Sequence, residues 1–446
     1  MARLDVNRLS WGDALRIGVP VLAVVLLAFY VTSRFVKPAP PDRVVMSTGA
    51  PGGAYERYAK RYQAFFARNG VSMELRASDG AVENLERLAH GSVDAGFVQG
   101  GVAPPQDEDA TPPIASLGAL YLEPVWVFAR ATPKPPQQLR DLAGKRISIG
   151  AAGSGTQPLA RMLLETVGVD SHDAKLLPLP SEASSSALAN GTIDAAIVVS
   201  GVSAPVVGDL VRRPDVVVIN LVHAQAIARQ HAFMTPLEIP RGLIDIRADL
   251  PDHDVNTVAV TANLLVRADM HPALMYLFLD AASAIHGRQT LLSDAGRFPN
   301  SMRQEFPLSD EADRFYKTGK PFLQRYLPFW VANLVDRMLV YLIPLIAVLV
   351  PALRFLPELI AYKPRSRIAA LYAKLRALEH EMMASTRDVA RIPEYVERLD
   401  AIESEVTAAK VPGWYAHDIY QLRAAIDLVR ERLGRPGAKA IPGFRS

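Results

Sequence analysis

Cysteine is absent from this chain of 446 residues. Without thiols, the protein cannot form disulfides, use a thiol nucleophile, or hold zinc or an iron–sulfur cluster through thiolate ligands. An excess of charge of one sign is also absent, because 49 Lys and Arg residues stand against 46 Asp and Glu residues. The net charge of +3 gives no field that favours a nucleic-acid partner. The length allows two or three folded domains.

Catalytic and metal-binding motifs are missing as well. The histidines show no HExxH or other metal-ligand spacing, and no motif joins one of them to a nucleophile and an acid. Asp94 and Asp194 each open a β-rich run, and we interpret them as capping or turn residues rather than a catalytic pair. Tyr121 and Trp126 lie where they could pack on a ligand or in a hinge core. The sequence therefore predicts no catalytic activity, metal or cofactor. An enzyme built on the α/β fold that is derived below is kept as an alternative.

Two apolar runs, residues 17–32 and 338–353, contain no charged side chain and lie between arginines. Sixteen helical residues span only ~24 Å, less than the ~30 Å of a hydrocarbon core, so flanking residues would have to complete each span. We expect transmembrane segments at residues 17–35 and 334–356. A cleaved signal peptide is the alternative for the first run, and a buried core helix for the second.

Basic residues near the second run predict the orientation in the membrane. They are more numerous after the run than before it, which places the C-terminus in the cytoplasm. Two spans put both termini on the same side, so residues 1–16 and 360–446 are predicted to be cytoplasmic. The block between the spans would then lie outside the inner (plasma) membrane of a bacterium, in the periplasm or beyond. The residues that carry this argument are Arg354, Lys363, Arg365, Arg367, Lys374 and Arg376.

The middle block, residues 42–330, alternates short β-rich runs with helical patterns in two cycles. The first cycle runs from the strand at 43–48 to the strand at 94–99, and the second begins near residue 131. This βαβαβ order predicts parallel sheets, and the late β-rich run at 255–266 suggests a return to the first lobe. We therefore expect an α/β clamshell with a hinge. Lobe 1 would comprise about 42–124 and 260–328, and lobe 2 about 125–259.

The tail beyond residue 360 has a helical pattern with apolar residues spaced by three and four. Two such seams are each about two heptads long, with a further helix at 394–410 between them. The tail is predicted to be a small helical bundle or hairpin, or a module that forms a homodimer. The seams comprise Ile368, Leu371, Leu375, Leu378 and Met382, and Ile419, Leu422, Ile426, Val429 and Leu433.

Each expected lobe has a glycine-rich turn between a strand and a helix, at residues 47–53 and 150–156. Unpaired N–H groups at a helix start attract anions, and glycine lets a ligand approach the backbone. Two further helix starts, at 78–80 and 180–181, are expected at the same crevice. Each turn alone is also consistent with an ordinary connection, and Ser78, Asp79 or Ser181 with an N-cap. Neither turn fits a Walker or dinucleotide motif.

Several motifs taken in order resemble the TAXI family of TRAP-transporter solute receptors over roughly residues 43–320. They are Ser47–Gly49 with Gly52–Tyr55, Ala77–Leu85 (ASDGAVENL), Asp94–Gln99, Gly150–Thr156 (GAAGSGT) and Asn190–Ala196. The resemblance implies a type II periplasmic-binding-protein fold and a small organic anion or amino acid in the cleft. It also implies the membrane-anchored subgroup, with a C-terminal transmembrane helix and helical tail. Carried over by position, it assigns ligand binding to Thr48, Gly52, Gly53, Tyr55, Val82, Glu83, Gln99, Gly153, Ser154, Gly155 and Thr156.

The first loop departs from the family pattern. Ala50-Pro51 and Glu56 replace residues that the family usually has there, which removes one backbone donor and adds negative charge. We expect a membrane-anchored receptor that delivers a carboxylate or amino-acid-like solute to TRAP permease subunits or another membrane protein. The alternative is a sensor that signals through the second span to the cytoplasmic helices. The sequence leaves open the ligand, transport versus signalling, the oligomeric state and cleavage of residues 1–36.

Overall fold

The computed structural model describes residues 19, 22–23, 25–27, 29–34, 38–103, 113–131, 134–170, 172–302, 305–384, 391–409 and 415–434. Side chains are not described for residues 345, 348–349 and 352–364. The chain divides into two compact units. One is Pro38–Asp336, and the other combines Met1–Lys37 with Arg337–Ser446. The predicted N-terminal segment 1–16 lies outside the described residues.

The first lobe of the unit Pro38–Asp336 is built on three parallel strands. β1 lies between β2 and β3 in the sheet, and two helices make the connections in the expected βαβαβ order. Helix α2 buries Ala59, Tyr62 and Phe66, whose spacing puts them on one helix face against the sheet. The elements are β1 (Arg43–Ser47), α2 (Ala54–Arg68), β2 (Ser72–Arg76), α3 (Ala81–Ala89) and β3 (Ala95–Gln99).

The second lobe repeats this plan. β5 pairs in parallel with β6 and β7, and α4 and α5 make the connections. Its core contains Ile147, Leu163 and Ile197, all at most 1% exposed. The elements of this lobe are η2 (Leu139–Leu142), β5 (Arg146–Ser148), α4 (Thr156–Thr166), β6 (Lys175–Leu177), α5 (Ser181–Ala189), β7 (Ala195–Val199), α6 (Pro205–Val211), β8 (Val216–Val218), α7 (Ala224–Gln230) and β9 (Thr235–Ile239).

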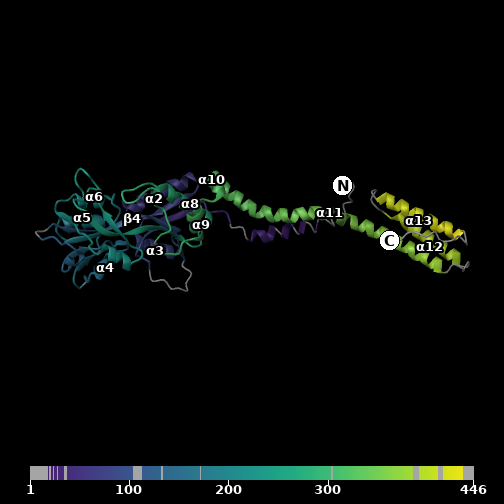
Figure 1. The fold of residues 1–446 in the computed structure, drawn as a ribbon, viewed down its shortest axis with the longest axis horizontal. Helices are drawn as coiled ribbons and strands as arrows, with labels where there is room; N and C mark the ends of the chain where they lie inside the picture. The colour runs from purple at the N-terminus through teal and green to yellow at the C-terminus, as the bar shows by residue number, and fades with distance from the viewer. Residues whose placement is uncertain are drawn as a thin grey trace. The chain divides into compact units, whose positions relative to one another are not determined.

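Two long strands, β4 (Ile114–Arg130) and β10 (Val255–Arg267), run from one lobe into the other. They pair antiparallel with each other, β10 also pairs with β3, and β4 also pairs with β7, which gives the order β2-β1-β3-β10-β4-β7-β5-β6. Figure 1 shows β4 between the helices of the first lobe (α2, α3, α8, α9) and those of the second (α4, α5, α6). The expected two-lobed α/β fold is confirmed. The parallel pairing expected within each lobe is confirmed, whereas the two crossing strands run antiparallel to each other and to β3 and β7.

The chain returns to the first lobe after β10. Helix α8 (Pro272–His286) packs against α2 and the sheet, with Phe278 buried between Tyr62 and Phe66. Helices α9 (Asp310–Thr318) and α10 (Phe322–Tyr326) follow, and Phe329 at the start of the next helix is 8% exposed in the same hydrophobic core. The first residues of α11 (Phe329–Ala384) therefore belong to the folded lobe.

The second unit contains α12 (Ile392–Ala408), α13 (Ala416–Gly434) and most of α11. The two predicted seams face each other within one chain, where Leu378, Leu399, Leu422 and Ile426 are at most 1% exposed. These three helices share one hydrophobic core. A homodimer through these helices would need a different face, because the seams are already covered, and it stays a prediction.

Among the described residues, no helix combines the length and apolar character needed to cross a membrane. Parts of both predicted spans lie outside that description, namely several residues of 17–35 and several side chains of 334–356. Where the two segments are described, Phe29 stacks on Tyr341 with ring centroids 5.0 Å apart.

Candidate functional site

The glycine-rich loop of the second lobe is held in a conformation that glycine favours. It follows β5 and leads into α4, which begins at Thr156. Gly150 and Gly153 have φ angles of +88° and +80°, which other L-residues rarely adopt. Ser154 Oγ donates a hydrogen bond to the carbonyl of Ala151 over 2.7 Å, which fixes the turn from inside. The local sequence therefore sets the loop shape without help from the other lobe.

This loop touches the start of α3 in the first lobe. The backbone N–H groups of Val82 and Glu83 both donate to the carbonyl of Gly153, over 3.1 and 3.3 Å. The Nε2 group of Gln99 donates to the carbonyl of Gly155 over 3.0 Å. These bonds join the two lobes directly, so the structure shows the clamshell closed on itself at this point.

Close backbone approach explains the glycines on this side. A Cβ atom at Gly155 would lie 3.0 Å from the Cβ atoms of both Ala81 and Gln99. One at Gly153 would lie 3.1 Å from the Cβ of Asp79. Such contacts are tighter than ordinary van der Waals distances, so a larger residue would push the lobes apart.

In the first glycine-rich loop, by contrast, the hydrogen-bond donors are bonded to groups of the same lobe. The amide of Gly52 donates to Glu56 Oε2 over 2.7 Å, and that of Gly53 donates to the carbonyl of Ala50 over 3.0 Å. Thr48 is 1% exposed, and its hydroxyl donates to the carbonyl of Arg76 over 3.2 Å. Hydrogen bonds from Lys60 and the Gly52 amide lower the pKa of Glu56. The carboxylate of Glu56 thus sits where an anionic ligand would otherwise meet this loop.

Some of the remaining predicted site residues lie at the contact between the lobes, and others form hydrogen bonds within their own lobe. Glu83 accepts from the amide of Asp79 over 2.7 Å and pairs with Arg87, so its carboxylate acts within α3. Thr156 is 8% exposed at the first position of α4, beside Gly150. The structure therefore brings together Val82, Glu83, Gln99 and the 153–155 loop, and leaves the 48–53 loop turned toward its own strands.

Asn84, which the sequence did not single out, organises the first lobe. Its carboxamide is fully buried, accepts from the hydroxyls of Ser47 and Ser78 over 2.6 Å each, and donates to two backbone carbonyls. Those acceptors are Thr48 and Phe97, so one side chain joins β1, β3 and the start of α3. Asn84 lies one turn before Leu88 on the buried face of α3. This helical spacing is the feature of the sequence that could have indicated the burial of Asn84.

Glu123 is a second residue that sequence reasoning missed. It is 4% exposed, lies on β4 just before the crossing between lobes, and accepts a hydrogen bond from Tyr55 Oη over 3.1 Å. Burial raises the pKa of its carboxyl to about 7. The sequence does contain a feature that could have indicated this residue, because Glu123 is the one acidic residue in the mostly apolar run Ile114–Arg130.

The aspartates and aromatic residues weighed earlier have structural roles. Asp94 accepts from the amide of Val45 over 2.8 Å, and Asp194 accepts from that of Arg146 over 2.9 Å. Each aspartate lies directly before a strand, β3 or β7, and ties it to the neighbouring strand. The guanidinium of Arg146 lowers the pKa of Asp194. The indole of Trp126 is fully buried and donates to the carbonyl of Ser200 over 3.0 Å.

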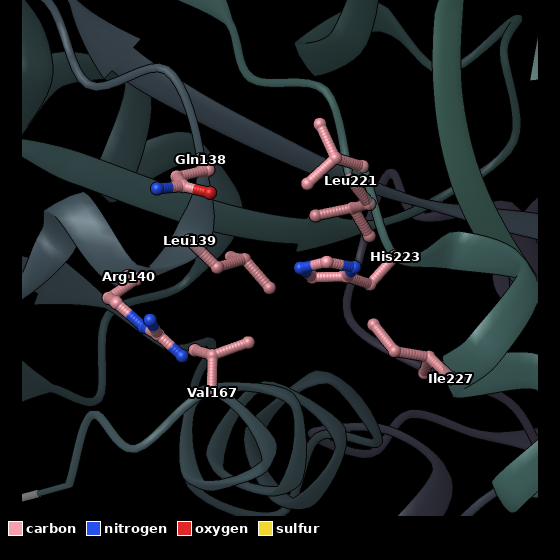
Figure 2. A pocket seen from close by; sticks show the side chains of 8 residues that line it. Gln138, Leu139, Arg140, Val167, Leu221, His223 and Ile227 are labelled. Atoms are coloured by element: carbon pink, nitrogen blue, oxygen red, sulfur yellow. The ribbon is translucent and has the colours of Figure 1, made fainter.

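Away from the glycine loops, the part of the chain that the structure describes has a small hollow but no metal-ligand group. The described residues contain no group of three or more His, Asp or Glu side chains that could hold a metal ion. A small hollow of about 50 Å³ is lined by Gln138, Arg140, Val167 and His223, among others (Figure 2). Val167 ends α4, whereas the glycine loop precedes that helix, so about one helix length, ~16 Å, separates hollow and loop.

Comparisons with solved structures give distant resemblances. A protein from Bordetella bronchiseptica RB50 is 16% identical over 56% of this chain and 72% of its own, with a TM-score of 0.41. The aliphatic sulphonate binding protein SsuA from Escherichia coli is 15% identical over 70% and 79%, with a TM-score of 0.37. The L-arginine-bound substrate-binding protein AbpA from Streptococcus pneumoniae is 14% identical over 54% and 88%, with a TM-score of 0.34. These scores are too low to support an argument about function.

The sequence itself assigns the family. Residues 46–317 match the model of the NMT1-like family, and this range covers both lobes of the α/β unit. The finer TAXI resemblance is neither part of this match nor excluded by it. Since the matched range exceeds half of the chain, this protein belongs to the NMT1-like family.

Proposed function

We propose that the protein is a membrane-anchored extracytoplasmic receptor of the TAXI type for a small carboxylate or amino-acid-like solute. One observation carries the proposal: the loop 150–156 of one lobe is hydrogen-bonded to the start of α3 and to Gln99 of the other. Two lobes that meet through backbone donors and acceptors have the elements needed to enclose a small polar ligand. The NMT1-like family assignment supports the same function.

The closed contact suggests how a solute enters. Gly153 offers its carbonyl to the N–H groups of Val82 and Glu83, which are otherwise free donors at a helix start. When the lobes separate, these donors become available for a solute carboxylate, which the helix dipole also favours. The solute then replaces the Gly153 carbonyl, and the lobes close around it rather than on each other.

The ligand-binding residues of this proposal form two sets. Val82, Glu83 and Gln99 would contribute from the first lobe through the α3 start and β3, and Gly153, Ser154, Gly155 and Thr156 would contribute from the second. The first-loop residues Thr48, Gly52, Gly53 and Tyr55 would have a smaller direct role, because Glu56 already occupies the Gly52 amide. No catalytic residue, metal or cofactor is part of the mechanism.

Membrane anchoring is the second part of the proposal, with both termini in the cytoplasm of a bacterial cell. It is supported by large apolar side chains that are roughly half exposed, which in water would be unfavourable but in lipid would not. They cluster at the two predicted spans: Leu22, Leu26, Leu27, Phe29 and Val31, and Met338, Leu339, Val340, Leu342, Ile343, Ile346 and Val350. Extraction of the full chain from membranes by carbonate wash, as opposed to detergent, would refute anchoring.

Solute delivery to a TRAP-type permease is the proposed role, because two spans cannot form a transport path alone. Signalling is the second candidate, and one observation favours it. Helix α11 starts in the core of the first lobe at Phe329 and supplies Leu371, Leu375 and Leu378 to the core of the helical bundle. Capture of permease subunits by the full chain would support delivery, whereas ligand-dependent crosslinking between bundles in membranes would support signalling.

Calorimetry on the full chain in detergent tests the receptor function. Amino acids and dicarboxylates serve as probes, and Thr156→Ala should weaken the best of them by about 10- to 150-fold if its hydroxyl bonds to a charged group. Thr166→Ala is the matched control, because that hydroxyl lies at the far end of α4 and donates to the carbonyl of Met162. Absence of binding by every probe, or equal loss in both variants, would contradict the proposal.

A further inference from the structure

A group of large apolar side chains is exposed where the first lobe ends. Helix α10 buries none of its residues, and its Phe322 and Tyr326 are 71% and 74% exposed. Their rings lie side by side with centroids 5.3 Å apart, so both project from one face of this short helix. Such an exposed apolar cluster marks a contact with lipid or with another protein. The group, which we call the aromatic patch, comprises Phe322, Tyr326, Trp330, Val331 and Leu334.

The aromatic patch is fixed to the first lobe at both of its ends. The guanidinium of Arg325 donates through Nε to the carbonyl of Lys320 over 2.9 Å and through Nη2 to that of Thr318 over 3.0 Å, which holds α10 against the end of α9. The indole of Trp330 packs on Gly70, where a Cβ atom would lie 2.9 Å from Nε1. The patch therefore moves with the lobe rather than as a loose connection.

The chemistry of the aromatic patch favours the headgroup layer of a membrane. Trp and Tyr combine an apolar ring with one polar group, and they are enriched at that layer in membrane proteins. Residues 319–335 contain two basic residues and no Asp or Glu. Lys320 pairs with Asp280. Arg325 is exposed, as is Arg68 two residues before the glycine on which the indole packs, so lipid phosphates would meet positive charge here.

The chain also continues from this patch toward a segment that we propose to span the membrane. Helix α11 extends from Phe329 to Ala384 and includes the predicted span 334–356. Trp330 lies four residues before that segment, about 6 Å along the helix. The headgroup layer is itself about 5–7 Å thick on each side of the hydrocarbon core. The indole would therefore lie at headgroup level, next to the other rings of the patch.

From these observations we infer that the aromatic patch docks the first lobe on the headgroup layer of the membrane. The inference goes beyond the receptor function and rests on the proposed anchoring through the second span. Phe322 and Tyr326 would insert among the headgroups, and Arg325 and Arg68 would contact phosphates. A docked first lobe leaves the second lobe as the part that moves when the clamshell opens.

Nitroxide labels on the full chain in nanodiscs of phosphatidylethanolamine and phosphatidylglycerol test the docking. The chain has no cysteine, so Phe322→Cys and Tyr326→Cys are each labelled at one site, on a helix that buries no residue. Relaxation of the label by oxygen, which prefers lipid, and by a water-soluble nickel complex gives its depth. We expect both labels about 5–10 Å into the interface. Ile246→Cys is the matched control, because this apolar side chain is 88% exposed in the second lobe and its label should lie in water.

The outcomes separate the docking from the anchoring. If the Phe322→Cys and Tyr326→Cys labels are as accessible to nickel as the Ile246→Cys label, the docking alone is overturned. Shielding of both labels from oxygen as well as nickel would mean that protein covers the patch, either a second copy or another chain, and would also overturn it. Release of the full chain from membranes by carbonate wash would overturn the anchoring and the docking with it.

Discussion

Replacing Gly155 with alanine should shift the clamshell toward its open form. The backbone at Gly155 has φ −67° and ψ −21°, which alanine adopts freely, so the substitution adds only the methyl group. That methyl would lie 3.0 Å from the Cβ atoms of Ala81 and Gln99 and also 3.0 Å from Cδ of Gln99. All three atoms belong to the opposite lobe, so the strain exists in the closed state alone.

The size of the shift follows from the cost of overpacking. An extra methyl in a packed contact costs about 1–3 kcal/mol, which corresponds to roughly a 5- to 150-fold change in the ratio of open to closed molecules. The overall stability should change little, because the lobes relieve the strain by separating rather than by unfolding. Solute affinity should fall by a similar factor, since the enclosed state becomes less favourable.

Distances between spin labels would measure the opening. The chain has no cysteine, so two introduced cysteines are labelled uniquely. Ala64 on α2 and Glu165 on α4 are exposed and lie in different lobes. Gly201→Ala is the matched control, because a Cβ atom there would meet nothing within 4 Å. Identical distance distributions for the wild-type chain, Gly155→Ala and Gly201→Ala would refute the reasoning.

Three further outcomes are expected. Asn84→Ala should lower the free energy of unfolding by about 2–4 kcal/mol, because four buried hydrogen bonds lose a partner, and thermal denaturation beside the exposed control Ser186→Ala measures this. The raised pKa of Glu123 means that the folded state binds a proton on this carboxyl more tightly than the unfolded state does, so the stability that this proton contributes is lost as the pH rises toward 7. Burial lowers the pKa of His286 to about 3, so the stability that its neutral ring contributes is lost as the pH falls below 6.5. Glu123→Gln should therefore leave a chain that loses roughly 2 kcal/mol more than the wild-type chain between pH 7 and 5 in denaturant titrations, and an unchanged pH profile would contradict these assignments. Leu399→Ala should cost the helical bundle about 2–5 kcal/mol, seen as a lower melting temperature of the helical signal, and an unchanged melting curve would contradict its place in that core.

Sequence patterns predicted most of the fold because they report local chemistry. The alternation of strands and amphipathic helices located β1 to β3 and β5 to β7 within a few residues. Two features escaped it. The short strand β9 (Thr235–Ile239) contains a proline, and its assignment depends on pairing with β10. The antiparallel direction of β4 and β10 depends on contacts between residues more than a hundred positions apart.

Prediction of the site was limited in a different way. The glycine loops were recognised, because positive φ angles and helix starts have short-range signatures. Which loop meets which helix start could not be predicted, because that depends on how two lobes close. Glu56 is an example: its negative charge is evident from the sequence, but its hydrogen bond to the Gly52 amide depends on the folded shape of the loop. Asn84 and Glu123 act through burial, which a sequence without aligned relatives reveals poorly.

The pairing of β4 with β10 has a mechanical consequence. Both connections between the lobes are adjacent strands, and they stay hydrogen-bonded to each other from Ile114 to Pro124. Bending across their plane distorts these bonds little, whereas sliding one strand along the other or twisting them apart would break several at once. The lobes therefore open most easily by this bending, and they close along the same path. This alignment would return the Gly153 carbonyl to the amides of Val82 and Glu83 on each closure.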